Sequence, residues 1–94
     1  MADFKVFVTS RFERELKKLN ASHPDLSEQY AEVVGILQID PYNHTRRHPI
    51  KKLEAVAEGQ GQYRIRRGRF RFRYDIDRQE VYLKACSLRR EDTY

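Results

Sequence analysis

The chain contains no long apolar run, a single cysteine, three prolines and four glycines in 94 residues. Without a long apolar run or the apolar core of a signal peptide, nothing in it supports a membrane location. Because Cys86 has no partner, an internal disulfide framework is excluded, which is consistent with a reducing cytoplasm. We therefore expect one cytoplasmic domain, residues 1–94, with Cys86 as a small strand residue.

The sequence also lacks the residue arrangements that are typical of common metal and catalytic centres. The three histidines (His23, His44 and His48) lack metal-ligand spacing, and no carboxylate pair accompanies the basic segments. Glycine-rich phosphate loops, Ser-His-Asp arrangements and CxxC pairs are absent. We expect no cofactor and no metal, so chemistry on a phosphodiester would have to be metal-free. RNA permits this, because its 2′-hydroxyl is an internal nucleophile that a protein needs only to position while stabilising the phosphorane.

Positive charge is concentrated in one part of the chain. Residues 46–73 hold ten Lys/Arg and two Asp/Glu, whereas both flanking segments are net negative in a protein of charge +5. Concentrated basic charge is typical of proteins that bind nucleic acid or anionic membranes.

Periodicity predicts an α+β fold. A β-rich run at 4–8 precedes a helix capped by Thr9 or Ser10, whose pattern breaks at Asn20. Ser22 can cap a second helix over 24–39, followed by a loop at 40–49 and a weak strand at 50–55. We expect an N-terminal strand and a two-helix hairpin packed on a small antiparallel sheet, with the uncovered face basic.

Residues 64–73 carry six arginines that alternate with apolar residues around Gly68, as expected for a half-buried β-hairpin. With Arg67-Gly68 as the turn, the predicted pairs are Arg66 with Arg69, Arg64 with Arg71, Gln62 with Arg73, Ile65 with Phe70, and Tyr63 with Phe72. A second turn at Asp77-Arg78 predicts pairs of Tyr74 with Val81, Phe72 with Leu83, Phe70 with Ala85, Arg73 with Tyr82, and Arg71 with Lys84. This register places Arg64, Arg71 and Lys84 in one row.

The arginine-rich face has two interpretations. Alternating arginine on an exposed sheet face can simply aid solubility and protect edges, but that role predicts mixed charge, and carboxylates are nearly absent before Asp75. Arginine suits phosphate because its planar fork donates two hydrogen bonds at once, so we favour anion binding. Tyr82 is either a base-stacking residue or a cation–π partner of Arg73. The run 46–52 is either a solvated loop or brings Lys51 or Lys52 to a scissile phosphate.

Three segments together resemble the RelE/ParE superfamily of toxins from type II toxin–antitoxin systems. They are KLE at 52–54, GQYRIRRGRFRFRYDI at 61–76 and RREDTY at 89–94. The family's N-terminal helix pattern is matched by Phe12, Glu15, Leu16 and Leu19. The likeness spans nearly the whole chain.

The resemblance implies a toxin neutralised by a cognate antitoxin protein. RelE-like members cleave mRNA in the ribosomal A site without metal, through attack by the 2′-hydroxyl, and so inhibit translation. The resemblance implies catalytic roles for Arg64, Arg90, Lys52 and Tyr94, and we add as RNA-binding candidates Lys51, Arg66, Arg69, Arg71, Arg73, Tyr82, Lys84 and Arg89. The alternatives are a ParE-like gyrase inhibitor that acts by binding, and a non-catalytic RNA- or ribosome-binding module.

Overall fold

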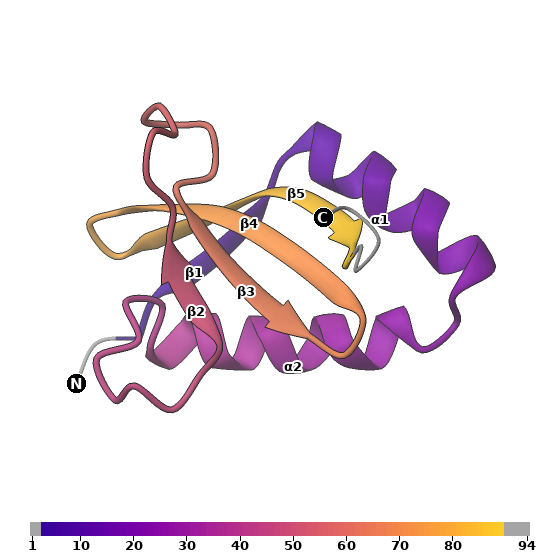
Figure 1. Cartoon of the computed structure of the whole chain (residues 1–94), viewed down its shortest axis with the longest axis horizontal. Helices are drawn as coiled ribbons and strands as arrows, with labels where there is room; N and C mark the ends of the chain where they lie inside the picture. Colours follow the sequence, from indigo (N-terminus) through magenta and orange to yellow (C-terminus); the bar gives the residue numbers. More distant parts are fainter. Residues whose placement is uncertain (1–2, 90–94) are drawn as a thin grey trace.

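Two helices cover one face of a five-stranded sheet in the computed structural model, which describes residues 3–89 (Figure 1). In chain order the elements are β1 (Lys5–Val8), α1 (Ser10–Ser22), α2 (Leu26–Ile39), β2 (Ile50–Lys52), β3 (Tyr63–Arg67), β4 (Phe70–Asp77) and β5 (Glu80–Leu88). The α+β class and the packing of a helical hairpin on a sheet are confirmed. In the part of the chain that is described, neither helix is long and apolar enough to cross a bilayer.

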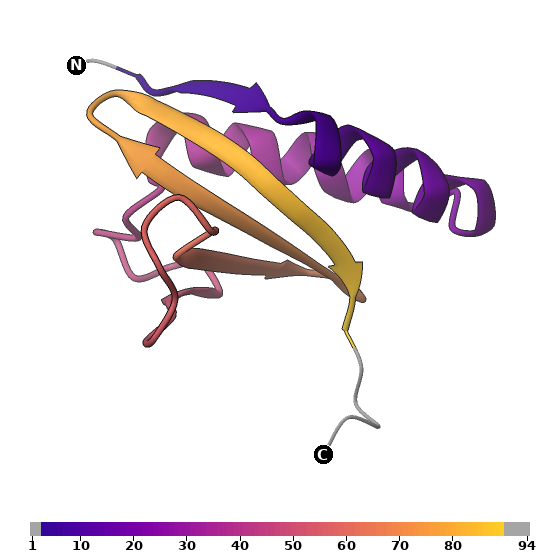
Figure 2. The same ribbon diagram turned by 90° about the horizontal axis from the view of Figure 1, so that it is seen from above.

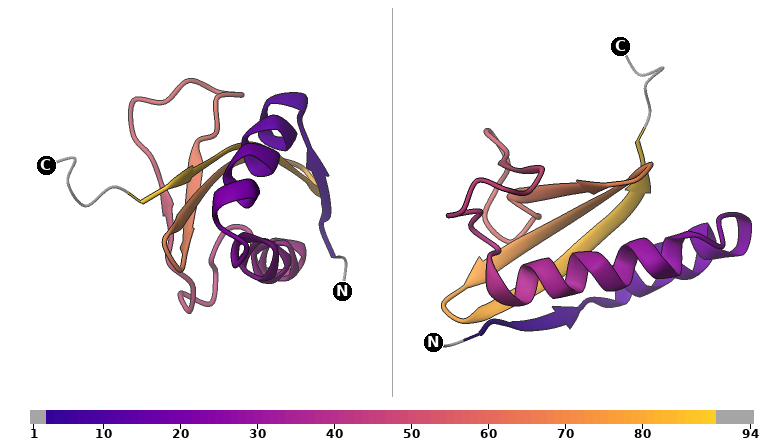
Figure 3. Two further views of the ribbon diagram at one scale, coloured as in Figure 1. Left: turned by 90° about the vertical axis from the view of Figure 1, so that its right-hand side faces the viewer. Right: turned by 90° about the horizontal axis from the view of Figure 1, so that it is seen from below.

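The sheet has the strand order β1-β5-β4-β3-β2. Strands β2 to β5 pair antiparallel, as expected, while β1 pairs parallel with β5 and makes the sheet mixed. Both helices lie on the same side of this sheet, as the two perpendicular views show (Figures 2 and 3). The other side, which we call the open face, carries the solvent-facing side chains of the strands.

The element boundaries agree with the sequence prediction at the start of α1 and differ from it further along the chain. Thr9 is the N-cap of α1, because its hydroxyl oxygen accepts a hydrogen bond from the Phe12 amide at 3.3 Å and donates to the Leu83 carbonyl at 2.9 Å. The helix continues through Asn20 to Ser22, so the predicted break at Asn20 and the predicted cap at Ser22 are wrong. Helix α2 begins two residues later than predicted, and the predicted strand 50–55 ends at 52.

The core lies between the helices and the sheet and consists of apolar side chains from both layers. Its buried members are Phe12, Leu26, Val33, Leu37, Ile65, Phe70, Phe72, Tyr74, Val81, Leu83 and Cys86. Burying each large side chain contributes about 1.5–3 kcal/mol. The Tyr74 hydroxyl donates to the Pro41 carbonyl at 2.8 Å, which satisfies the polar atom inside this core. Cys86 is a buried strand residue, as expected, and its burial raises the pKa of the thiol to about 12.

The first hairpin turns at Gly68-Arg69, one residue later than predicted. Gly68 has φ +59 and occupies the first central position of the turn, where two-residue hairpins with a leading glycine need a positive φ. The observed pairs are Tyr63 with Tyr74, Arg64 with Arg73, Ile65 with Phe72, Arg66 with Arg71, and Arg67 with Phe70. Each predicted partner is therefore displaced by two positions. A displacement by two positions leaves every side chain on the same face of the sheet. The prediction of a basic open face is therefore correct although the predicted pairs are wrong.

The second hairpin also turns one residue later, at Arg78-Gln79, and contains a β-bulge. The register shifts between Arg73 and Tyr74, and Lys84 is the residue of β5 left without a partner. The observed pairs include Asp75 with Tyr82, Tyr74 with Leu83, Arg73 with Ala85, Phe72 with Cys86, Arg71 with Ser87, and Phe70 with Leu88. The predicted pairs across this turn, and the row of Arg64, Arg71 and Lys84, are consequently wrong. Nothing in the sequence pattern marks Lys84 as an extra, unpaired residue. The prediction therefore assumed one constant register between β4 and β5 along the whole length of β5.

Candidate nucleic-acid interface

Cations from three strands form rows on the open face. Lys51 of β2 lies directly opposite Arg64 of β3, which in turn lies opposite Arg73 of β4. Arg66 and Arg71 form a second cross-strand pair on the same face. Like charges placed directly opposite cost about 0.2–1 kcal/mol per pair. The rows thus concentrate positive charge where a polyanion would relieve the repulsion.

The two neighbouring lysines of β2 point to different faces. Lys52 lies opposite Tyr63, whose own cross-strand partner Tyr74 is a core residue. The Lys52 ammonium lies 5.8 Å from the centroid of the Tyr63 ring, a cation–π distance. Lys51 therefore shares a face with Arg64, and Lys52 does not.

Arg73 fastens the loop 53–62 to the sheet. Its Nε donates to the Gly61 carbonyl at 3.1 Å, and its Nη2 donates to the Gln60 carbonyl at 2.9 Å. The Asp75 carboxylate accepts the backbone N–H groups of Gly61 at 2.8 Å and Gln62 at 2.9 Å. The loop lies on the side of the sheet away from the helices (Figures 2 and 3). Arg73, expected to bind RNA, thus has at least two of its donors directed to the chain itself.

Gly61 allows this close approach of loop and strand. Its φ is +82, and an added Cβ would lie 3.0 Å from the Cβ of Arg73. A side chain here meets both an unfavourable backbone conformation and a rigid strand atom. The contact with Arg73 was not visible in the sequence, because twelve residues separate the two positions.

The second row carries a cation with spare hydrogen-bonding capacity. The Nε of Arg71 is buried and has no hydrogen-bond partner among residues 3–89. Arg71 lies between Arg66 of β3 and Ser87 of β5.

Two other arginines of the hairpin contact helix α2 instead. Arg67 forms an ion pair with Glu32, and the Nη2 of Arg69 lies 3.1 Å from the Oδ1 of Asp25. The hydrogen bond from Arg69 lowers the pKa of the Asp25 carboxyl. Arg69 was expected to bind RNA, but the structure places it in the turn, where its partner is the carboxylate of Asp25, the N-cap residue of α2.

An aromatic pair lies at the β1 side of the open face. Phe7 and Tyr82 stack with ring centroids 5.4 Å apart and planes at 20°. The Lys84 ammonium lies 5.8 Å from the Tyr82 ring centroid, so Lys84 takes the cation–π role that the sequence suggested for Arg73. The Tyr82 hydroxyl donates to Glu80, and this hydrogen bond raises the pKa of the tyrosine. Phe7 was missed in the sequence because a short β-rich run gives no sign of its register with β5.

The end of β5 is held against the first hairpin. The Arg89 amide donates to the Arg69 carbonyl at 2.7 Å, and the Arg89 side chain donates to the Gly68 carbonyl at 3.3 Å. Arg90 and Tyr94, both predicted to be catalytic, lie outside the described residues.

The basic loop before β2 is organised by a buried carboxylate. Asp40 accepts hydrogen bonds from the Thr45 hydroxyl at 2.6 Å and from the amides of His44 and Thr45 at 2.8 and 3.2 Å. Burial opposes its ionisation, but these hydrogen bonds outweigh that effect and keep the pKa of the carboxyl below its ordinary value. Arg46 and Arg47 are exposed on this loop.

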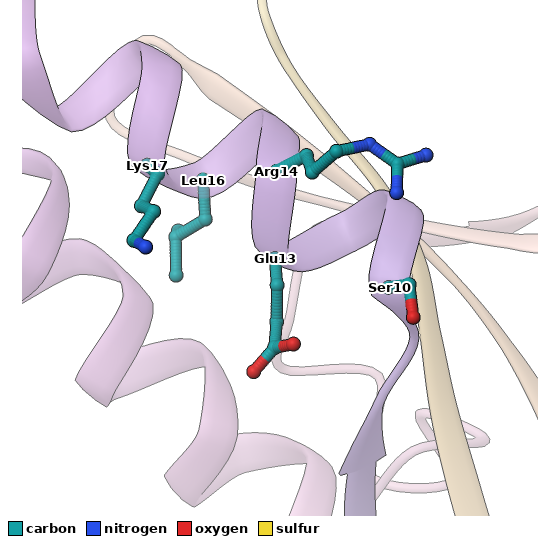
Figure 4. A pocket seen from close by; sticks show the side chains of 5 residues that line it. All are labelled: Ser10, Glu13, Arg14, Leu16 and Lys17. Atoms are coloured by element: carbon teal, nitrogen blue, oxygen red, sulfur yellow. The ribbon is translucent and has the colours of Figure 1, made fainter.

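Among residues 3–89, the best-formed hollow lies away from the basic rows. A pocket of about 460 Å³ runs along α1 and is lined by Ser10, Glu13, Arg14, Leu16 and Lys17 (Figure 4). Its charges are mixed, and it contains none of the predicted site residues. Among residues 3–89, no group of three or more His, Cys, Asp or Glu is placed to hold a metal ion. The open face is therefore the described surface on which the predicted residues come together.

Comparisons with known proteins found no matching family model and no matching curated protein. Two solved structures are similar over nearly their whole length. A chain of the archaeal RelE–RelB complex from Pyrococcus horikoshii OT3 gives a TM-score of 0.67 at 19% identity, over 94% of this chain and 97% of that one. A chain of the toxin–antitoxin complex RelBE2 from Mycobacterium tuberculosis gives 0.61 at 28% identity, over 95% and 94%.

The likeness to the archaeal chain, at 19% identity, shows the fold. The likeness to the RelBE2 chain, at 28% identity, shows the same fold in a second toxin–antitoxin complex. Together they support a toxin role. The resemblance to the RelE/ParE superfamily that the sequence indicated is confirmed, since the chain has the fold of chains from two RelE-type toxin–antitoxin complexes.

Proposed function

We propose that the protein is the toxin of a type II toxin–antitoxin system and a metal-independent endoribonuclease that cleaves mRNA in the ribosomal A site. The observation that carries the proposal is the cross-strand pair of Lys51 and Arg64 on the helix-free, basic face. The likeness to RelE–RelB and RelBE2 complexes supports it. Cleavage of message on the ribosome inhibits translation.

In this mechanism the 2′-oxygen of the RNA forms a bond to phosphorus, and the bond to the 5′-oxygen breaks. A proton leaves the 2′-hydroxyl, and a proton is delivered to the departing 5′-oxygen. Arg64 stabilises the extra negative charge of the phosphorane, because a guanidinium donates two parallel hydrogen bonds to phosphate oxygens. Lys51, its neighbour on the same face, holds the phosphate or assists proton transfer.

Further roles extend from this centre. By the resemblance, Arg90 adds a second cation at the phosphate, and Tyr94 orients the nucleotide. Arg66, Arg71 and Lys84 hold the RNA backbone along the open face. Arg73 acts through the loop 53–62 that it fastens, since its guanidinium already donates to Gly61 and Gln60. The geometry favours Lys51 over Lys52 for the role beside Arg64, because Lys52 lies over the Tyr63 ring.

The test is to map mRNA 5′ ends on programmed ribosomes with an empty A site, in EDTA, beside the same RNA free in solution. We expect cuts on the ribosome alone, and a loss of about 10²–10³-fold in cleavage rate for Arg64→Ala. Arg90→Ala is expected to lose cleavage as well. Parent-level cutting by both variants contradicts the assignment of these residues. Intact message in every lane contradicts the nuclease, and a gyrase supercoiling assay then tests the ParE-like alternative.

The same face is also the surface we propose for neutralisation by the antitoxin. Its rows of cations fit an acidic or amphipathic segment by charge complementarity. We expect the complex with the cognate antitoxin to weaken with added salt and to protect mRNA on the ribosome. An antitoxin that binds while ribosomal cleavage continues would contradict this placement.

A further inference from the structure

The stacked rings of Phe7 and Tyr82 form a surface that the basic rows do not account for. Phe7 is a large apolar residue that is 41% exposed. Tyr82 alternates with the buried residues Val81 and Leu83, so its ring lies on the open face. Phe7 is the direct partner of Tyr82 across the parallel pair of β1 and β5. A large apolar ring is thus held in solvent on the face that carries the cations.

The ring pair is fixed in place by its surroundings. The Tyr82 hydroxyl is bonded to Glu80, and both rings stand on hydrogen-bonded strands. The β-bulge of β5 leaves Lys84 without a strand partner, and its ammonium lies 5.8 Å from the Tyr82 ring centroid. A β-bulge changes the direction in which a side chain points, and here it accompanies the placement of the Lys84 ammonium beside the Tyr82 ring.

The ring pair lies on the same face as the basic rows, at a distance that a single-stranded RNA can cover. Strands β5 and β4 separate β1 from β3, and three strand spacings amount to about 14 Å. The carboxylates near the Tyr82 ring are those of its cross-strand partner Asp75, its hydrogen-bond partner Glu80, and Asp77. Asp75 is bonded to loop amides and Glu80 to Tyr82. These negative groups disfavour a phosphate directly at the rings, so the chemistry there suits an uncharged base.

We propose that Phe7 and Tyr82 form a stacking subsite for an unpaired nucleobase, with Lys84 contacting the adjoining phosphate. The proposal rests on the proposed function, which places RNA on the open face. Stacking of a base on an aromatic side chain tolerates any base, because every base has a π-face. The subsite therefore adds affinity and fixes the direction of the RNA across the sheet without selecting a sequence.

The test uses single-stranded oligoribonucleotides in which 2-aminopurine replaces one base at a time. Stacking on a protein ring quenches its fluorescence, so the position that is quenched locates the subsite. We expect Phe7→Ala to abolish quenching at one position and to raise Kd about 5- to 100-fold. Tyr82→Phe keeps the ring and should keep the quenching. Val8→Ala is the matched control, since Val8 is 40% exposed on the same strand and carries no ring.

The outcomes separate the subsite from the proposed function. Parent-like Kd and quenching in Phe7→Ala, with salt-sensitive binding intact, overturn the subsite and leave the basic rows as the RNA site. Absence of binding by the parent protein overturns both. Equal losses in Phe7→Ala and Val8→Ala overturn the stacking role. Unchanged RNA binding with weakened binding of the cognate antitoxin assigns the rings to a protein partner and also overturns the proposal. Unchanged thermal unfolding of each variant shows that the fold is kept.

Discussion

Lys51 lies directly opposite Arg64 in the antiparallel pair of β2 and β3, on the face away from the buried neighbour Ile65. The next residue, Lys52, lies over the Tyr63 ring on the other face. Two adjacent lysines therefore have different surroundings, and only the register of a three-residue strand decides which of them accompanies Arg64.

This difference makes the two lysines a matched pair for mutation. We expect Lys51→Ala to lower ribosome-dependent cleavage by at least about tenfold and to reduce the salt slope of RNA binding by about 0.7, the value for one phosphate contact on a single strand. Lys52→Ala should leave that slope closer to the parent value, because its ammonium lies over the Tyr63 ring. Cleavage rates and Kd values at several salt concentrations check this. A larger loss of cleavage in Lys52→Ala than in Lys51→Ala would show that Lys52, and not Lys51, acts beside Arg64.

The attachment of the loop 53–62 is tested with two glycines of that loop. Gly61→Ala should destabilise the protein by about 1–3 kcal/mol, since the new methyl group would crowd Arg73 at a positive φ. Gly59 also has a positive φ, +85, but nothing lies within 4 Å of its Cβ position. Gly59→Ala therefore reports backbone strain alone, and the difference between the variants measures the crowding. Urea denaturation gives both values, and equal losses would contradict a tight contact with Arg73.

We expect the buried carboxylate of Asp40 to contribute to the free energy of unfolding in a pH-dependent way. Its pKa is lower in the folded protein than in the unfolded chain, so the stabilisation is full above the unfolded-state pKa of about 3.9 and is lost as the pH falls through the folded-state value. Asp40→Asn should lower the free energy of unfolding by about 1–3 kcal/mol at pH 7. The gap between variant and parent should narrow in acid.

Denaturation curves of the parent and Asp40→Asn at neutral and acidic pH measure this gap. Asp77→Asn, at the exposed last residue of β4, is the control and should change stability by no more than about 0.5 kcal/mol. A gap that stays constant with pH would show that ionisation of Asp40 does not carry the effect.

The cap of α1 separates two residues that the sequence left as equal candidates. Thr9→Ala removes the bond to the Phe12 amide and the bond to the Leu83 carbonyl, and should cost about 1–2 kcal/mol. Ser10→Ala, in the exposed first turn, should stay within about 0.5 kcal/mol of the parent. Thermal unfolding of both proteins checks the order, and the reverse order would make Ser10 the cap.

Local pattern was enough for much of the architecture. The alternation of arginine with apolar residues over 64–73 predicted two strands with one basic face, and the structure has that face. Helical spacing predicted both helices, and Asp40-Pro41 marked the end of the second one. These inferences succeeded because side-chain periodicity is a property of the chain within a few residues.

Register and partner choice needed the folded molecule. Placing Gly68 at the first central position moved the turn, and the extra residue Lys84 shifted the rest of β5. The partners of Arg67, Arg69 and Arg73 come from helix α2, its N-cap residue and the loop 53–62, all outside the hairpin that carries the three arginines.

The sequence by itself determined the fold class, the family resemblance and the existence of a basic sheet face, because composition and periodicity encode them locally. Only the tertiary structure decided that Lys51 and not Lys52 faces Arg64, that Arg73 holds a loop, and that Phe7 stacks on Tyr82. The physical reason is that each of these contacts joins residues brought together by long-range strand pairing, whose register depends on turn geometry and on a bulge that no local pattern marks.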